Sequence, residues 1–139
     1  MGAFLLGTEG GRTPRSPHSG THPVDLTDHL PLTPVAFELL LSLAEGDRHG
    51  YAILQEVEKR TGGRMRLHAG TLYRALGRMV DDGFLVEIEV PAEEAADSRR
   101  RVYRLTASGR ALARAEAARL QRQVESARAR ELLEDPASA

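Results

Sequence analysis

The stretch from Gly70 to Gly83 has the residue spacing of one short amphipathic helix, and the rest of the chain is organised around it. Its apolar residues recur at intervals of three and four and therefore share one inward face: Leu72, Ala75, Leu76, Met79 and Val80. Gly83 follows, in the position where a glycine commonly ends a helix. The pattern predicts a helix with one buried side and one exposed side.

The exposed side of this helix is cationic and carries one aromatic residue. Thr71, Tyr73, Arg74 and Arg78 lie on it or beside it. No acidic residue occurs between positions 59 and 80, whereas the same interval contains Lys59, Arg60, Arg64, Arg66, Arg74 and Arg78. Such a helix suits insertion into the major groove of DNA. The alternative is a solvated surface helix whose arginines bind nothing, and charge alone does not decide between them.

Length and composition limit the class of protein. With 139 residues and a formal net charge of -1, the chain fits one small domain plus tails. Any DNA-binding surface must therefore come from local clustering of charge. The lack of cysteine excludes disulfides and thiolate zinc sites and suits the cytoplasm. The sequence has no apolar run that would span a membrane and no convincing signal peptide. Abundant arginine and alanine with a single lysine suggest a GC-rich bacterial genome.

Residues 1–28 are predicted to form a disordered N-terminal tail. Glycine, proline, threonine, serine and histidine dominate this segment, so it cannot bury enough apolar surface to offset chain entropy. Val24 and Leu26 are its candidates for docking onto the domain. The histidines of this region are irregularly spaced and lack partner cysteines, and we interpret them as surface residues: His18, His22 and His29. The sequence thus predicts no metal site and no cofactor.

Residues 29–106 are predicted to form a winged helix-turn-helix domain. The first of its three helices begins at Pro34 with Thr33 as N-cap, and the second runs from about His49 to Arg60. Residues 47–50 are expected to form a turn between them. The amphipathic helix described above is the third helix and is the one expected to read DNA.

Two predicted strands follow the third helix and make the wing. In residues 84–90, Val86, Ile88 and Val90 alternate with glutamates, which is typical of a half-buried strand. A second strand is expected at residues 100–105. The predicted fold class is therefore mainly α with a small β-wing.

Arginines at the wing and a tyrosine of the second helix are further candidates for DNA contact. Arg99, Arg100 and Arg101 are placed to contact phosphates or a minor groove. They could instead neutralise the nearby acids Glu93, Glu94 and Asp97. The hydroxyl of Tyr51, with the free N–H groups of the first helical turn, is expected to meet a phosphate. The alternative for Tyr51 is packing at the rim of the core.

Residues 107–134 are predicted to form a long C-terminal helix capped by Thr106. Apolar residues at intervals of four and three make a thin coiled-coil-like seam: Ala113, Ala117, Leu120, Val124 and Ala127. A lone helix with so little apolar area needs a partner, so we interpret it as the dimerisation helix of a homodimer. The alternative is a solvated helix that frays. The dimer is favoured because a small groove reader gains from two half-sites one turn apart.

Four short motifs resemble the PadR-like family of transcriptional regulators in order and spacing. They are Leu32-Thr33-Pro34, His49-Gly50-Tyr51, Gly70-Thr71-Leu72-Tyr73-Arg74-Ala75-Leu76, and Val102-Tyr103-Arg104-Leu105-Thr106 with Gly109. The resemblance covers about residues 32–133. It implies a winged-helix homodimer that usually represses transcription from double-stranded DNA. By motif, the DNA-facing residues of the family carry over to Tyr51, Thr71 and Tyr73.

The chain departs from the family pattern at the third helix. His68-Ala69-Gly70 stands where the family commonly has Ser-Pro-Gly, which weakens the N-cap. Arg74 replaces a proline and adds a cation where a phosphate or guanine could lie. Some family members bind aromatic effectors between protomers. With few aromatic residues and no tryptophan, this chain favours a protein-filled interface, although a small-molecule effector stays compatible with the family.

These features together favour a homodimeric DNA-binding repressor. We expect Tyr73, Arg74 and Arg78 to read bases, while the backbone is held by Tyr51, Arg64, Arg66 and the wing arginines. The alternative is a winged-helix protein-interaction module that does not bind DNA and docks an acidic partner. We expect no enzyme, because the sequence has no catalytic-triad order, phosphate-binding glycine loop or metal-spaced His/Glu pair.

Overall fold

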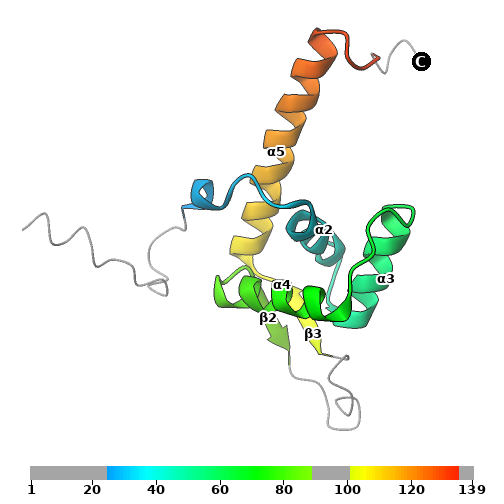
Figure 1. Ribbon diagram of the computed structural model, residues 1–139. Coiled ribbons are helices and arrows are strands. Elements are labelled where there is room, and N and C mark those ends of the chain that lie inside the picture. The colour runs from blue at the N-terminus through cyan, green and yellow to red at the C-terminus, as the bar shows by residue number, and fades with distance from the viewer. Residues whose placement is uncertain (1–24, 89–100, 135–139) are drawn as a thin grey trace, which may run out of the picture.

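The computed structural model describes residues 25–88 and 101–134 (Figure 1). The predicted tail up to residue 24 and the whole of the predicted wing loop lie outside the described residues, as do Val90, Arg99 and Arg100. The elements follow one another as η1 (Leu26–His29, a 3-10 helix), α2 (Pro34–Leu43), β1 (Arg48–His49), α3 (Gly50–Arg60), α4 (Ala69–Asp81), β2 (Leu85–Ile88), β3 (Val102–Leu105) and α5 (Ala107–Ala129). The predicted fold class is confirmed: a mostly helical winged helix-turn-helix with a small antiparallel sheet.

Side-chain caps fix where two of the helices begin. The Thr33 Oγ1 accepts a hydrogen bond from the Ala36 N–H at 3.1 Å, and Pro34 occupies the first helical position, as predicted. Thr106 caps α5 in the same way, because its Oγ1 accepts from the Gly109 N–H at 3.0 Å. The first helix of the helix-turn-helix and the long C-terminal helix therefore start where the sequence places them.

Helix α4 has the predicted buried and exposed sides. Leu72, Leu76 and Met79 lie in the hydrophobic core. Gly83 follows the helix with a φ of 85°, a left-handed conformation that glycine adopts without steric cost. At the other end, the N-cap residue His68 makes no side-chain capping hydrogen bond. The start of α4 is thus the weaker end, as expected from the missing serine.

The sheet has the strand order β1-β3-β2, and both pairings are antiparallel. In β3, Tyr103 lies opposite Arg48 of β1 and Glu87 of β2. The predicted turn over residues 47–50 is wrong at Arg48 and His49, which form β1. Two residues are too few to show an alternating pattern, and their pairing depends on β3, which is distant in sequence.

A single core joins all the main helices to the sheet. The buried core side chains come from α2, α3, α4, the strands with the preceding Phe84, and the start of α5, and include Leu39, Leu40, Leu43, Ile53, Val57, Leu72, Leu76, Phe84, Leu85, Tyr103 and Leu112. Arg104 adds a bidentate ion pair to Asp47 across the β1–β3 edge, with its Nη2 2.9 Å from Asp47 Oδ2. The sheet and helices are therefore held as one unit.

The segment from Asp25 to Leu32 packs on the domain although part of it belongs to the predicted tail. Leu26, Leu30 and Leu32 contact the core, so the expected docking of Leu26 is confirmed. The ring of His29 meets Phe84 edge to face, with centroids 4.9 Å apart. In Figure 1 this segment runs across α5 before α2 begins.

Helix α5 extends well beyond the rest of the fold (Figure 1). Its first turns pack on α2 and β3, and Leu112 is buried there. The helix ends at Ala129, earlier than predicted, because Glu131 adopts a φ of 62°. The Leu132 N–H then donates back to the Ala127 carbonyl at 2.8 Å, which closes the helix end. No helix among the described residues has the length and apolar character needed to cross a membrane.

Candidate nucleic-acid interface

The exposed side of α4 carries the cations that the sequence placed there. Arg74 and Arg78 are exposed, and Thr71 is half-buried beside them. Arg74 Nη2 lies 3.5 Å from Thr71 Oγ1, which is a long and weak contact. Within the described part of the chain, neither arginine forms an ion pair. Both guanidinium groups are therefore accessible to an anionic ligand.

Tyr73 lies at the junction between α3 and α4 rather than fully on the outer face. Its side chain is half-buried and packs against the core. The ring also lies directly against Gly50, the first residue of α3, which has no side chain to keep the ring away. Tyr73 therefore sets how closely α3 and α4 approach, and its role in reading bases stays a prediction.

The N-terminus of α3 offers backbone and side-chain donors. Its N-cap residue His49 makes no side-chain capping hydrogen bond. The Gly50 N–H donates a hydrogen bond to the Arg101 carbonyl oxygen at 2.9 Å, which connects the start of α3 to the start of β3. Tyr51 follows with half of its surface, 51%, exposed. A tyrosine hydroxyl beside the positive end of a helix is suited to an anion.

Arg60 has a structural role that the sequence analysis did not assign to it. Its Nη2 donates to Glu38 Oε1 at 2.8 Å and to Ser42 Oγ at 3.0 Å, both on α2. Its Nη1 donates to Glu56 Oε2 at 3.1 Å on α3. The side chain thus ties the end of α3 to α2, and only a folded structure reveals partners so far apart in sequence.

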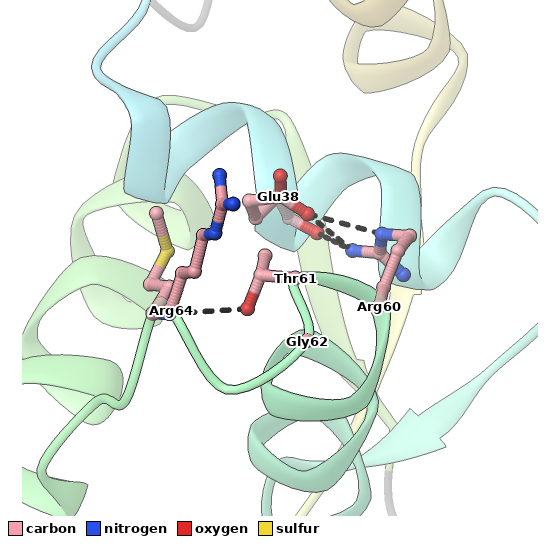
Figure 2. A pocket seen from close by; sticks show the side chains of 6 residues that line it. Glu38, Arg60, Thr61, Gly62 and Arg64 are labelled. Carbon is pink, nitrogen blue, oxygen red and sulfur yellow. Dashed lines mark hydrogen bonds and ion pairs between the residues drawn. The ribbon is translucent and has the colours of Figure 1, made fainter.

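Arg64 lines a shallow pocket of about 700 Å³ between α2 and the turn after α3 (Figure 2). The other lining residues are Glu38, Arg60, Thr61, Gly62 and Met65. Figure 2 shows the Arg64 side chain pointing toward α2, beside Glu38. Arg64 thus lines this pocket together with residues of α2 and of the turn after α3.

Two other predicted phosphate-binding arginines form ion pairs. Arg66, just before α4, has its Nε 3.3 Å from Glu58 Oε2 of α3. Arg101, just before β3, has its Nε 3.7 Å from Glu87 Oε2 of β2. All four side chains are substantially exposed. Arg99 and Arg100, the neighbours of Arg101, lie outside the described residues.

Tyr103 lies buried beneath the Glu87–Arg101 pair and connects the wing to the helices. Its side chain is only 3% exposed. Burial raises the pKa of Tyr103, and the charge of Glu87 raises that pKa further. The Tyr103 hydroxyl therefore stays protonated.

The predicted dimerisation seam divides into two parts along α5. Ala113, nearest the domain, packs against the core of its own protomer. Beyond it, Leu120 and Ala127 are half-buried, Ala117 is exposed and Val124 is 41% exposed. Only the distal part of the seam thus presents apolar surface that its own domain does not cover.

Glu116, which the sequence analysis missed, is a carboxylate in the middle of α5 that is only 2% exposed. Arg119 donates two hydrogen bonds to it, both 2.8 Å long. These bonds, together with a bond from the backbone of Leu32, lower the pKa of Glu116, although burial opposes the shift. The spacing of Glu116 and Arg119 was a signal for a helical ion pair, but not for burial under the N-terminal segment.

No cluster of three or more His, Asp or Glu side chains among the described residues could hold a metal ion. The chemistry available at this surface is therefore that of arginine and tyrosine donors toward an anionic, hydrogen-bonding ligand.

Comparison with known proteins agrees with this fold. The model of the transcriptional regulator PadR-like family matches residues 39–115. A transcriptional regulator from Clostridium thermocellum is similar with a TM-score of 0.57 and 24% identity, covering 66% of this chain and 84% of that chain. A PadR family transcription regulator from Clostridium difficile R20291 is similar with a TM-score of 0.56 and 22% identity, covering 68% of this chain and 94% of that chain. RosR from H. salinarum is similar with a TM-score of 0.53 and 28% identity, covering 71% of this chain and 80% of that chain. No curated protein sequence matches the chain.

Proposed function

Because this chain belongs to the PadR-like family of transcriptional regulators, we propose that it binds operator DNA as a homodimer and represses transcription. Helix α4 enters the major groove, and the wing lies along the phosphate backbone. Membership of this family supports a role as a transcriptional regulator and not as an enzyme. The proposed location is the cytoplasm of a bacterial cell, and the regulator works without a cofactor.

The observation that carries this proposal is the pair of exposed arginines on α4. Arg74 and Arg78 project from a helix whose other side is anchored in the core by Leu72 and Leu76. A rigid helix with unpaired guanidinium groups is the arrangement that reads guanine through its O6 and N7 atoms. Thr71, on the same side, is placed to contact a base edge or a phosphate.

The remaining side chains divide into backbone contacts and structural support. Tyr51 and the α3 N-terminus hold one phosphate, and Arg66 and Arg101 hold others, together with Arg99 and Arg100 of the wing. Tyr73 supports the α3–α4 junction in addition to its proposed contact with bases. Arg64 contributes least to this surface, because its side chain points into the pocket toward α2 (Figure 2).

The homodimer is supported by the distal part of α5. Leu120, Val124 and Ala127 lie on a helix that extends past the domain, and a second copy of the helix would cover them (Figure 1). Two protomers would present their α4 helices to half-sites about one helical turn apart. A small-molecule effector is compatible with this assembly, but no feature of the described residues points to one.

Fluorescence anisotropy with purified protein tests the proposal. The upstream DNA of the protein's own gene is compared with a scrambled duplex of equal length at two salt concentrations. Preferential binding to the upstream DNA, with affinity that falls steeply as salt rises, is the expected result. Absence of binding to either duplex at low salt would contradict the proposal and favour a winged-helix module that binds an acidic protein instead.

A further inference from the structure

Two arginines of the proposed DNA-binding surface are already occupied in the free protein. Arg66 is paired with Glu58 at 3.3 Å, and Arg101 is paired with Glu87 at 3.7 Å. The four side chains are between 44% and 76% exposed, so none is buried beyond the reach of a ligand. Each carboxylate occupies a position close to its arginine that a phosphate would otherwise take.

These pairs contrast with the arginines on α4 itself. Arg74 and Arg78 form no ion pair in the described ranges 25–88 and 101–134. The paired arginines lie outside α4, one in the segment before it and one in the wing. Two of the arginines proposed to hold the backbone are therefore paired, whereas the two proposed to read bases are not.

Arg101 is anchored through its main chain as well as through its ion pair. Its carbonyl oxygen accepts a hydrogen bond from the Gly50 N–H at 2.9 Å, and Glu87 lies opposite the neighbouring Tyr103 across the β2–β3 ladder. Arg101, Glu87 and Tyr103 thus form one cluster at the base of the wing. When a DNA phosphate binds Arg101 in place of Glu87, the Glu87 carboxylate is left unpaired beside that phosphate.

Resting on the proposed DNA-binding function, we propose that Glu58 and Glu87 compete with DNA phosphates for Arg66 and Arg101. Binding of a duplex exchanges two internal ion pairs for two phosphate contacts. The two glutamates then lie close to the DNA backbone and recruit cations. They lower the affinity for every sequence by the same factor, because neither paired arginine reads bases.

The size of the effect follows from the exposure of the pairs. A solvent-exposed ion pair changes an equilibrium constant by at most about fivefold. Each phosphate neutralised without competition adds up to about one to the slope of log affinity against log salt. Neutralising one glutamate should therefore tighten binding by about two- to fivefold and steepen that slope.

The test measures Glu58→Gln and Glu87→Gln on the preferred duplex and on a scrambled one. Glu125→Gln is the matched control, since it makes the same charge change on the distal part of α5. Both glutamine variants are expected to bind both duplexes more tightly by a similar factor, and Glu125→Gln is expected to match the wild type. In an Arg101→Ala background the gain from Glu87→Gln should vanish, while the gain from Glu58→Gln should persist.

Three results would overturn the inference while leaving DNA binding intact. They are unchanged affinity in both glutamine variants, a gain equal to that of Glu125→Gln, and a gain from Glu87→Gln that survives removal of Arg101. The last result would mean that Glu87 acts only as a repulsive charge. If the wild type binds neither duplex at low salt, the proposed function itself fails, and the two failures are thereby distinguished.

Discussion

The Cα of Gly50 lies against the ring of Tyr73, so closely that a Cβ at position 50 would stand 2.5 Å from the tyrosine hydroxyl. The same Cβ would lie 2.7 and 2.8 Å from two ring carbons. This contact joins the first residue of α3 to the third helix of the helix-turn-helix. Glycine at position 50 is therefore required by the closeness of two helices and not by an unusual backbone angle.

Replacing Gly50 with alanine should displace the ring of Tyr73, which packs against the core, and destabilise the domain. We expect a loss of about 1–3 kcal/mol in the free energy of unfolding, the usual range for overpacking, and weaker operator binding. Gly77→Ala is the control, because no atom lies within 4 Å of a Cβ there. Alanine should stabilise that exposed helical position by about 0.5–1 kcal/mol. Urea unfolding measures both, and equal effects would contradict the assigned contact.

Arg74→Ala should relax sequence preference. Loss of a bidentate contact to guanine is expected to cost about 1–3 kcal/mol on the operator and little on scrambled DNA. Arg122→Ala, on the exposed part of α5, serves as control for the change in charge. Competition binding with single-base variants of the operator measures the effect. Equal losses on operator and scrambled DNA would instead assign Arg74 to the phosphate backbone.

Val124→Glu should prevent dimer formation. A charge in the proposed seam would be desolvated without a partner, and we expect the dimer dissociation constant to rise by about tenfold or more. Gln123→Glu introduces the same charge at the adjacent exposed position and should leave the dimer intact. Sedimentation equilibrium distinguishes the two variants. If the wild type is monomeric, or if both variants form dimers, the assignment of α5 to a dimer interface is wrong.

Acid should destabilise the fold through Glu116, the buried carboxylate of α5. The pKa of Glu116 is lowered from its ordinary value of 4.5, chiefly by the hydrogen bonds from Arg119. A carboxyl whose folded-state pKa is lowered adds stability above the unfolded value and loses it as pH falls through the folded value. Urea unfolding at several pH values should thus show a steeper acid loss for the wild type than for Glu116→Gln. Parallel curves would exclude this role, and Glu125→Gln controls for lost charge.

Much of the fold could be predicted because its signals are local. The spacing of Leu72, Leu76 and Met79 indicated α4, and the capping residues Thr33 and Thr106 indicated where two helices begin. Each of these signals lies within a few residues of the feature it predicts. The family resemblance rested on short motifs of the same local kind.

The parts that could not be predicted depend on contacts between distant segments. The pairing of Arg48 and His49 with β3 and the clamp of Arg60 on α2 require the folded chain. The burial of Glu116, which is 2% exposed, likewise arises only in the folded chain. At the candidate site, the sequence indicated which residues are cationic but not which of them are paired. The structure alone shows that Arg66 and Arg101, which were predicted as phosphate contacts, form ion pairs with Glu58 and Glu87.

The Thr106 hydroxyl, besides capping α5, donates to the carbonyl of Gly83, two residues after the end of α4, at 2.7 Å. The Thr106 N–H donates to the adjacent Phe84 carbonyl at 3.1 Å. Two hydrogen bonds from one threonine thus connect the end of the helix proposed to read DNA to the start of the helix proposed to join two protomers. In a dimer built on α5, the distance between the two α4 helices would therefore be fixed by the dimer interface. Such a regulator should tolerate a changed base within a half-site better than a base pair inserted between half-sites.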